Sequence, residues 1–169
     1  QNVSASASTQ ALTLHWPAAE DPASGVGGYE VATAILPVAI VDTLPASGRS
    51  AEVTGLPPCL PSTLLVSAFD RLGNVSGWQQ GTGTPTLAPL TNVRVVERPG
   101  VVELAWDPVQ GATSYVTCLA NSDPECLSNA LASEILGGGA TSWVQAPPTG
   151  AHVALVRAFG GNGTCPGPV

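Results

Sequence analysis

The sequence predicts an all-β chain made of two tandem domains. The 19 Gly and 16 Pro among 169 residues disfavour helices, and the apolar runs are rich in β-branched residues, which favour strands. The segment at residues 68–76, Ala-Phe-Asp-Arg-Leu-Gly-Asn-Val-Ser, has a weaker echo 90 positions later, at residues 158–163. We therefore expect two copies of one module, with domains at residues 1–87 and 88–169.

The composition excludes some partners. Charged residues make up only 10 % of the chain, which has five Arg, no Lys and a net charge of −7. The Arg are scattered, and phosphate binding needs clustered cations, so nucleic acid is not an expected partner. No apolar run approaches the ~20 residues of a membrane helix, so no membrane span is expected. The start at Gln1 indicates a secretory cleavage or a trimmed chain, and we expect an extracellular or cell-surface protein.

In the first half, seven strands are separated by turn residues. Residues 3–7 alternate apolar and hydroxyl side chains, and residues 11–16 alternate more strongly, with Leu12, Leu14 and Trp16 on one face. Further strands are expected at residues 29–33, 38–44, 50–56, 63–69 and 78–84. Pro85 and Pro89 then mark a short, stiff linker.

The second half repeats this order. Strands are expected at residues 93–98, 101–106, 115–120, 127–136, 141–145 and 152–159. Only residues 164–169 remain after the last turn, and two of them are Pro, so the final strand should be short or incomplete. Such an edge can receive a strand from elsewhere, and the extended start at residues 1–9 is a candidate donor.

These residues resemble the fibronectin type III family, the seven-stranded sandwich of the immunoglobulin-like class. In the first half the matching residues, in the family's order and spacing, are Trp16 and residues 25–31, 53–58 and 66–76. The second half matches more weakly, at Trp106, Asp107, Pro108, Tyr115, Pro147, Pro148 and Ala158. The resemblance implies two tandem sandwiches with a Trp and a Tyr in each core: Trp16 with Tyr29, and Trp106 with Tyr115.

One departure from the family occurs in both halves. The family places a Tyr six residues after the Leu that precedes the prolines, where its hydroxyl ties the corner to the backbone. Here these positions hold Ser62 and His152. We expect another interaction to hold this corner, and a bond formed by cysteine is the candidate.

Four Cys in a small chain that looks secreted suggest two disulfides, for which three pairings exist. Cys118 and Cys126 flank residues 121–124 symmetrically, so a hairpin would place them opposite each other, within reach of a disulfide. In a head-to-tail tandem of the resembled sandwiches, Cys59 and Cys165 would meet at the junction. The alternatives are that one or both pair with a neighbouring chain or stay reduced.

We find no catalytic constellation, so the chain is not predicted to be an enzyme and no cofactor is expected. His15 and His152 fall at strand positions in separate halves, and the Cys spacing does not fit a zinc site. Acidic pairs could offer oxygens to Ca²⁺ but are typical of solvated loops: Glu20 with Asp21, and Asp123 with Glu125. N-glycosylation triplets begin at Asn2, Asn74 and Asn162.

Strand parity predicts an apolar outer face. If Leu64, Val66 and Ala68 face the core, then Leu65 and Phe69 face outward. The same parity places Val153, Leu155 and Phe159 outward in the second half, and Ala32 and Ala34 beside Leu65 in the first. An apolar outer face is typical of a contact surface, so we predict that these residues form an interaction face.

Two functions from different classes stay open. The first is a non-catalytic extracellular structural or adhesive module, a subunit of a secreted filament or surface assembly that contacts other copies or neighbouring domains. The second is a spacer or accessory pair within a larger secreted hydrolase, either a carbohydrate-active enzyme or a protease. Carbohydrate binding through Trp78 and Trp143 is a third and weaker option, which requires both to be exposed.

Overall fold

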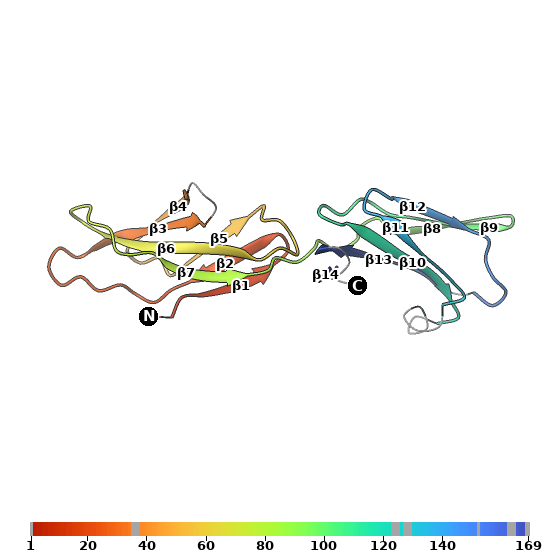
Figure 1. Ribbon diagram of the computed structural model, residues 1–169, viewed down its shortest axis with the longest axis horizontal. Helices are drawn as coiled ribbons and strands as arrows, with labels where there is room; N and C mark the ends of the chain where they lie inside the picture. Colours follow the sequence, from red (N-terminus) through yellow and green to blue (C-terminus); the bar gives the residue numbers. More distant parts are fainter. Residues whose placement is uncertain are drawn as a thin grey trace. The chain divides into compact units, whose positions relative to one another are not determined.

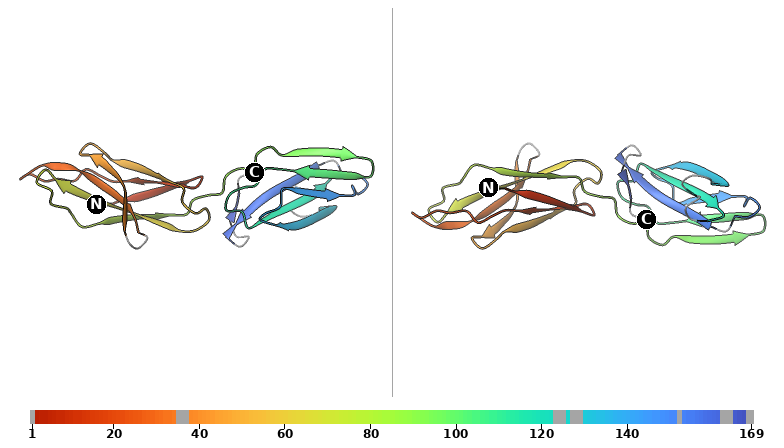
Figure 2. Two further views of the ribbon diagram at one scale, coloured as in Figure 1. Left: turned by 90° about the horizontal axis from the view of Figure 1, so that it is seen from above. Right: turned by 90° about the horizontal axis from the view of Figure 1, so that it is seen from below.

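The structure, a computed structural model, describes residues 2–34, 38–122, 126, 130–151, 153–161 and 165–167. As predicted, it is all-β, and each half is a sandwich of a three-stranded and a four-stranded antiparallel sheet (Figures 1 and 2). The chain divides into two compact units, unit 1 at Gln1–Thr86 and unit 2 at Leu87–Val169. None of the described residues belongs to a helix long and apolar enough to cross a membrane.

Unit 1 follows the predicted strand order. Its strands are β1 Ser4–Ser8, β2 Ala11–His15, β3 Val26–Thr33, β4 Ala39–Pro45, β5 Ser50–Thr54, β6 Ser62–Asp70 and β7 Gln79–Gly83. The sheets have the orders β1-β2-β5 and β4-β3-β6-β7. The segment at residues 1–9 was a candidate donor strand, but β1 is paired within its own unit, with Ser4 opposite His15.

Unit 2 repeats this topology. Its strands are β8 Arg94–Arg98, β9 Val101–Ala105, β10 Ser114–Ala120, β11 Ala132–Gly137, β12 Ser142–Gln145, β13 Val153–Gly160 and β14 Cys165–Pro166. The sheets have the orders β12-β9-β8 and β11-β10-β13-β14. The strand expected at residues 127–136 begins only at Ala132, and residues 127–129 lie outside the described ones. Of the last strand, the structure describes β14, in which Cys165 and Pro166 lie opposite Gly160 and Phe159, and residues 162–164 and 168–169 lie outside the described ones.

Each core is built around a Trp–Tyr pair that joins the two sheets. Trp16 follows β2 of the three-stranded sheet, Tyr29 lies in β3 of the four-stranded sheet, and their ring centroids are 5.5 Å apart. In unit 2 the centroids of Trp106 and Tyr115 are 5.3 Å apart. All four side chains are at most 6 % exposed. The four residues taken as core markers thus lie inside the two sandwiches.

The Tyr hydroxyl of each pair also holds the loop that follows the Trp. In unit 1 the backbone N–H of Ala19 donates to Tyr29 Oη over 2.8 Å. In unit 2 the N–H of Val109 donates to Tyr115 Oη over the same distance. Because a buried N–H without a partner is costly, this hydrogen bond fixes how the chain crosses from one sheet to the other.

The substitution Tyr115→Phe should lower the free energy of unfolding of unit 2 by about 1–3 kcal/mol, because the buried Val109 N–H loses its acceptor. Tyr29→Phe is the matched variant and should cost less, because Ala19 is only half-buried and water can reach its N–H. Amide hydrogen exchange measured at increasing urea concentrations assigns each loss of unfolding free energy to unit 1 or to unit 2. Equal losses in the two variants would contradict the role given to burial.

Candidate functional site

The outer face of the four-stranded sheet in unit 1 carries Leu65 and Phe69. Both are half-buried, whereas Leu64 and Val66, which point into the core, are 0 % and 4 % exposed. Phe69 lies opposite Gly28, and a Cβ built on Gly28 would lie 2.5 Å from Phe69 Cζ. The Phe69 ring therefore covers the glycine of the neighbouring strand.

Ala32 lies on the outer side of the sheet beside Leu65, as strand parity predicts, but it is not exposed. Its cross-strand neighbours are Leu65 and Ile40, and between these larger side chains Ala32 is 0 % exposed. Ile40 itself is 54 % exposed, and Ala34 is exposed as well. The apolar surface of unit 1 is therefore narrower than the strand parity suggested.

Unit 2 has the more open outer face. Ile135 of β11 is 75 % exposed, and across the sheet from it stand Val116 of β10 and then Arg157 of β13. Arg157 shares its side of β13 with three half-buried apolar residues. We name the apolar residues of this face the outer patch: Val116, Ile135, Val153, Leu155 and Phe159.

Arg157 supplies the only charge on the described strands of this face. Its Cζ lies 5.7 Å from the ring centroid of Phe159, which is a cation–π geometry. Its Nε is buried and has no hydrogen-bond partner within the described part of the chain. A buried donor without an acceptor costs free energy, so Arg157 has hydrogen-bonding capacity left for a partner.

A disulfide joins Cys118 and Cys126, with the Cα atoms 5.8 Å apart. The route of the bridge differs from the predicted hairpin, because Cys118 lies opposite Ser133 and Cys126 precedes β11. The bridge therefore ties β10 to the connection before β11 rather than to a cross-strand neighbour. Because Cys118 and Val116 lie on the same side of β10, the bridge borders the outer patch.

Cys59 and Cys165 belong to different units, and their pairing with each other stays a prediction. Neither is a free thiol. Cys59 has a positive φ of 63°, and its N–H donates to the Pro85 carbonyl over 2.7 Å. At the corner nearby, the Ser62 hydroxyl makes a short-range contact of 3.5 Å with the Leu60 carbonyl. His152 lies outside the described residues.

Asp70, a carboxylate that the sequence analysis did not single out, organises the tip of unit 1. It accepts the backbone N–H groups of Leu72 and Asn74, each over 2.8 Å, and the side-chain amide of Asn74 over 2.7 Å. The Ser24 hydroxyl donates over 2.8 Å to Asp70 Oδ2, the oxygen that also accepts the Asn74 side-chain amide. The Asn74 amide and then the Ser24 hydroxyl hold the pKa of Asp70 well below its usual range. An Asp before a Gly-Asn turn is the sequence signal that could have revealed this role.

Of the acidic residues considered for Ca²⁺, the structure describes Glu20 and Asp21. The Ser24 hydroxyl and two backbone N–H groups bind Asp21, and that hydroxyl first of all lowers the pKa of Asp21. Within the described ranges, no three His, Cys, Asp or Glu side chains form a group that could hold a metal. Asp123 and Glu125 lie outside those ranges.

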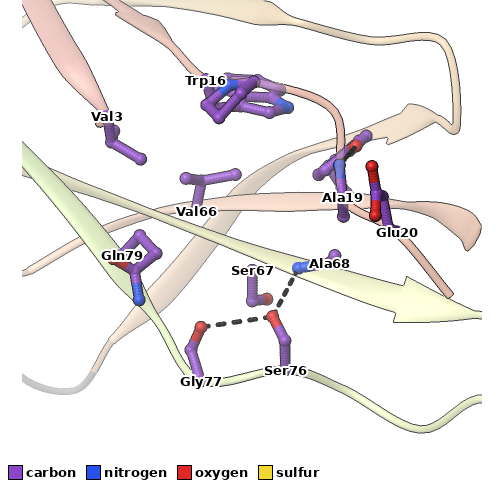
Figure 3. Close-up of a pocket in the computed structure, with 12 residues that line it drawn as sticks. Val3, Trp16, Ala19, Glu20, Val66, Ser67, Ala68, Ser76, Gly77 and Gln79 are labelled. Carbon is purple, nitrogen blue, oxygen red and sulfur yellow. Dashed lines mark hydrogen bonds between the residues drawn. The ribbon is translucent and has the colours of Figure 1, made fainter. Parts of the chain in front are cut away.

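Unit 1 contains a cavity of about 410 Å³ beside the start of β1. Trp16, Val66 and Val3 line one part of it, and Ser76, Gly77 and Gln79 line another (Figure 3). Trp16 Nε1 is buried without a partner among the described residues, but the same holds for Trp106 Nε1 in unit 2. The unpaired indole therefore belongs to the repeated core and does not mark a ligand site. A second cavity, of about 240 Å³, is lined by Asp21, Asp70 and their neighbours.

The two Trp considered for carbohydrate do not form a platform. Trp78 is 40 % exposed, but Trp143 is only 5 % exposed, which corrects the expectation for this residue. Trp143 lies opposite the core residue Leu104 and donates its Nε1–H to Glu134 Oε2 over 2.8 Å. Its side of β12 therefore faces inward.

The remaining candidates are surface groups. His15 Nε2 lies 3.4 Å from Ser6 Oγ, with both side chains exposed on neighbouring strands and outside the two cavities. Asn2 and Asn74 are exposed, and Asn162 lies outside the described residues.

No protein-family model and no curated protein matches the sequence. Among solved structures, the two fibronectin type III domain segment from chicken tenascin is similar over 99 % of this chain and 94 % of that one, with a TM-score of 0.73 and 13 % identity. The FN1–FN3 domains of chicken CNTN1 are matched over 99 % of this chain and 60 % of that one, with a TM-score of 0.40 and 18 % identity. At these identities the likeness shows the fold alone.

Because the pKa of Asp70 is low, the stability of unit 1 should depend on pH. Because the pKa is lower in the folded state, the ionised carboxylate stabilises the fold above about pH 4, and this stabilisation is lost as the pH falls below that value. The variant Asp70→Asn should melt at a lower temperature than the wild type at neutral pH, and this difference in melting temperature should narrow as the pH falls below about 4. Thermal unfolding between about pH 2 and 7 measures it.

The control is Asp42→Asn, because among the described residues the Asp42 carboxylate accepts only the N–H of its neighbour Thr43. This variant should melt close to the wild type throughout the pH range. If the difference in melting temperature between Asp70→Asn and the wild type did not change with pH, the carboxylate would not be the source of the stabilisation.

Proposed function

Because the chain has the fold of two tandem fibronectin type III domains, we propose that it is a non-catalytic extracellular module that works through protein contacts. The observation that carries this proposal is the outer patch of unit 2, where Ile135 is 75 % exposed beside half-buried apolar side chains. Monomers seldom expose apolar patches beyond a few hundred Å². A protein surface that covers the outer patch would remove this exposure.

The partner that we propose is another copy of the chain or a neighbouring domain of the same protein, as in a secreted filament or surface assembly. The chain carries a net charge of −7, but the described strands of this face hold no carboxylate on the side of the outer patch. Two such patches can therefore meet without opposed carboxylates, which supports self-association.

The extracellular location is supported by the Cys118–Cys126 disulfide, because such bonds persist in oxidising compartments and are rare in the cytosol. The role as an accessory pair of a larger hydrolase stays a prediction from the sequence. Of the two Trp considered for carbohydrate binding, only Trp78 is exposed, because Trp143 is buried.

Self-association can be tested by light scattering of the wild type over a range of protein concentrations. The variant Ile135→Glu places a charge in the outer patch, so the dissociation constant of the oligomer should rise by roughly tenfold or more. Leu72→Glu is the matched control, because Leu72 is 79 % exposed in a turn of unit 1. A wild type that stays monomeric at high concentration, or an equal effect of both variants, would contradict the proposal.

We also propose that Cys59 pairs with Cys165. The bridge would close a loop of about 107 residues and, in the chain-entropy model, stabilise the fold by about 5 kcal/mol. Cleavage by trypsin after Arg49, Arg71 and Arg157 separates peptides 50–71 and 158–169 and leaves Cys118 and Cys126 together on a third peptide. Mass spectrometry without reduction should find the first two peptides joined. A peptide 50–71 that runs free of peptide 158–169 would refute the pairing.

A further inference from the structure

The outer faces of the two four-stranded sheets carry the same apolar residues at matching positions. Leu65 and Phe69 of unit 1 have Leu155 and Phe159 of unit 2 as counterparts at the repeat offset of 90, and all four side chains are half-buried. β4 and β11, which occupy the same place in the two sheets, each add an exposed isoleucine to this side: Ile40 and Ile135.

The two faces differ in charge at one cross-strand pair. In both units this pair joins the residue that follows the core Tyr to a residue of the neighbouring strand. In unit 1 the pair is Glu30 with Ser67, and in unit 2 it is Val116 with Arg157. The same place in the sheet therefore holds a carboxylate in unit 1 and a guanidinium in unit 2.

Each of these charges stands alone on the described strands of its face. Around Glu30 the outer side of the unit 1 sheet presents only apolar, hydroxyl and amide side chains. Arg157 is the only charged residue on the outer side of the described strands in unit 2. We name the surface in unit 1 the acidic face: Glu30, Ile40, Leu65 and Phe69.

Neither charge has a counter-ion within its own unit. Glu30 is half-buried, and among the described residues no side chain forms an ion pair or a hydrogen bond with its carboxylate. The Arg157 guanidinium lies over the Phe159 ring, and its buried Nε has no hydrogen-bond partner in the described part of the chain. A partly buried charge without a counter-ion costs free energy, so an opposite charge on a partner would stabilise each of them.

We propose that the acidic face of unit 1 binds the outer patch of unit 2 in another copy of this chain, with Glu30 paired to Arg157 in the contact. The inference rests on the proposed function and names the surface of the second copy that meets the outer patch. Contact between two outer patches would leave both guanidiniums without a carboxylate, and contact between two acidic faces would oppose two carboxylates. The mixed contact pairs opposite charges and covers apolar residues on both sides.

A contact between two different faces has a consequence for assembly. Each copy carries one acidic face and one outer patch, so a copy bound through one of them still offers the other. Contacts of this heterologous kind build open filaments, or rings where the rotation between copies closes. The mixed contact therefore supplies the repeating step that a filament or surface assembly needs.

Charge reversal in the full chain tests the pairing, with self-association measured by light scattering over a range of concentrations. Glu30→Arg and Arg157→Glu each oppose like charges in the contact, so the dissociation constant should rise by about tenfold or more. The double variant exchanges the two charges and should associate within about threefold of the wild type, because the two effects are coupled. An equimolar mixture of the two single variants should also associate, since the new cation of one meets the new carboxylate of the other.

Two matched controls make the same changes in net charge on the other sheets. Glu52→Arg alters an exposed residue of β5 in unit 1, and Arg94→Glu alters an exposed residue of β8 in unit 2. Both should associate like the wild type. Unfolding temperatures show whether each variant is folded. Where a reversal unfolds the chain, Glu30→Gln or Arg157→Gln removes the charge at nearly constant shape and should still raise the dissociation constant by about threefold or more.

Three outcomes would overturn the mixed contact. The first is self-association that Ile135→Glu weakens but the folded charge variants do not, which would leave the proposed function intact and remove the ion pair from it. The second is a folded double variant, or a mixture, that associates no better than the single variants. The third is a wild type that stays monomeric at high concentration, which would overturn the proposed self-association as well.

Discussion

Both sandwiches depend on the contact between a Trp of the three-stranded sheet and a Tyr of the four-stranded sheet. This pair sets the spacing of the sheets, with centroid distances of 5.5 Å and 5.3 Å in the two units. The Tyr hydroxyl then accepts an N–H from the loop that joins the sheets, at 2.8 Å in both. Because the same contact and the same hydrogen bond recur in both units, the two sandwiches share one core framework.

In unit 1 the last strand lies close to the facing sheet. The β7 backbone approaches the leucines of β2, and the glycines of β7 permit this approach. A side chain at Gly81 would collide with Leu14, and one at Gly83 would collide with Leu12.

Much of this arrangement could be predicted from the sequence, because strand parity is a local property. Alternation placed Leu64 and Val66 inward and Leu65 outward. It could not give exposure, which depends on distant residues: Phe69 covers Gly28 of another strand, and Trp143 finds its acceptor on Glu134 of β11. The Cys118–Cys126 bridge followed from nearness in sequence, but its route depends on where β11 begins, which alternation does not determine.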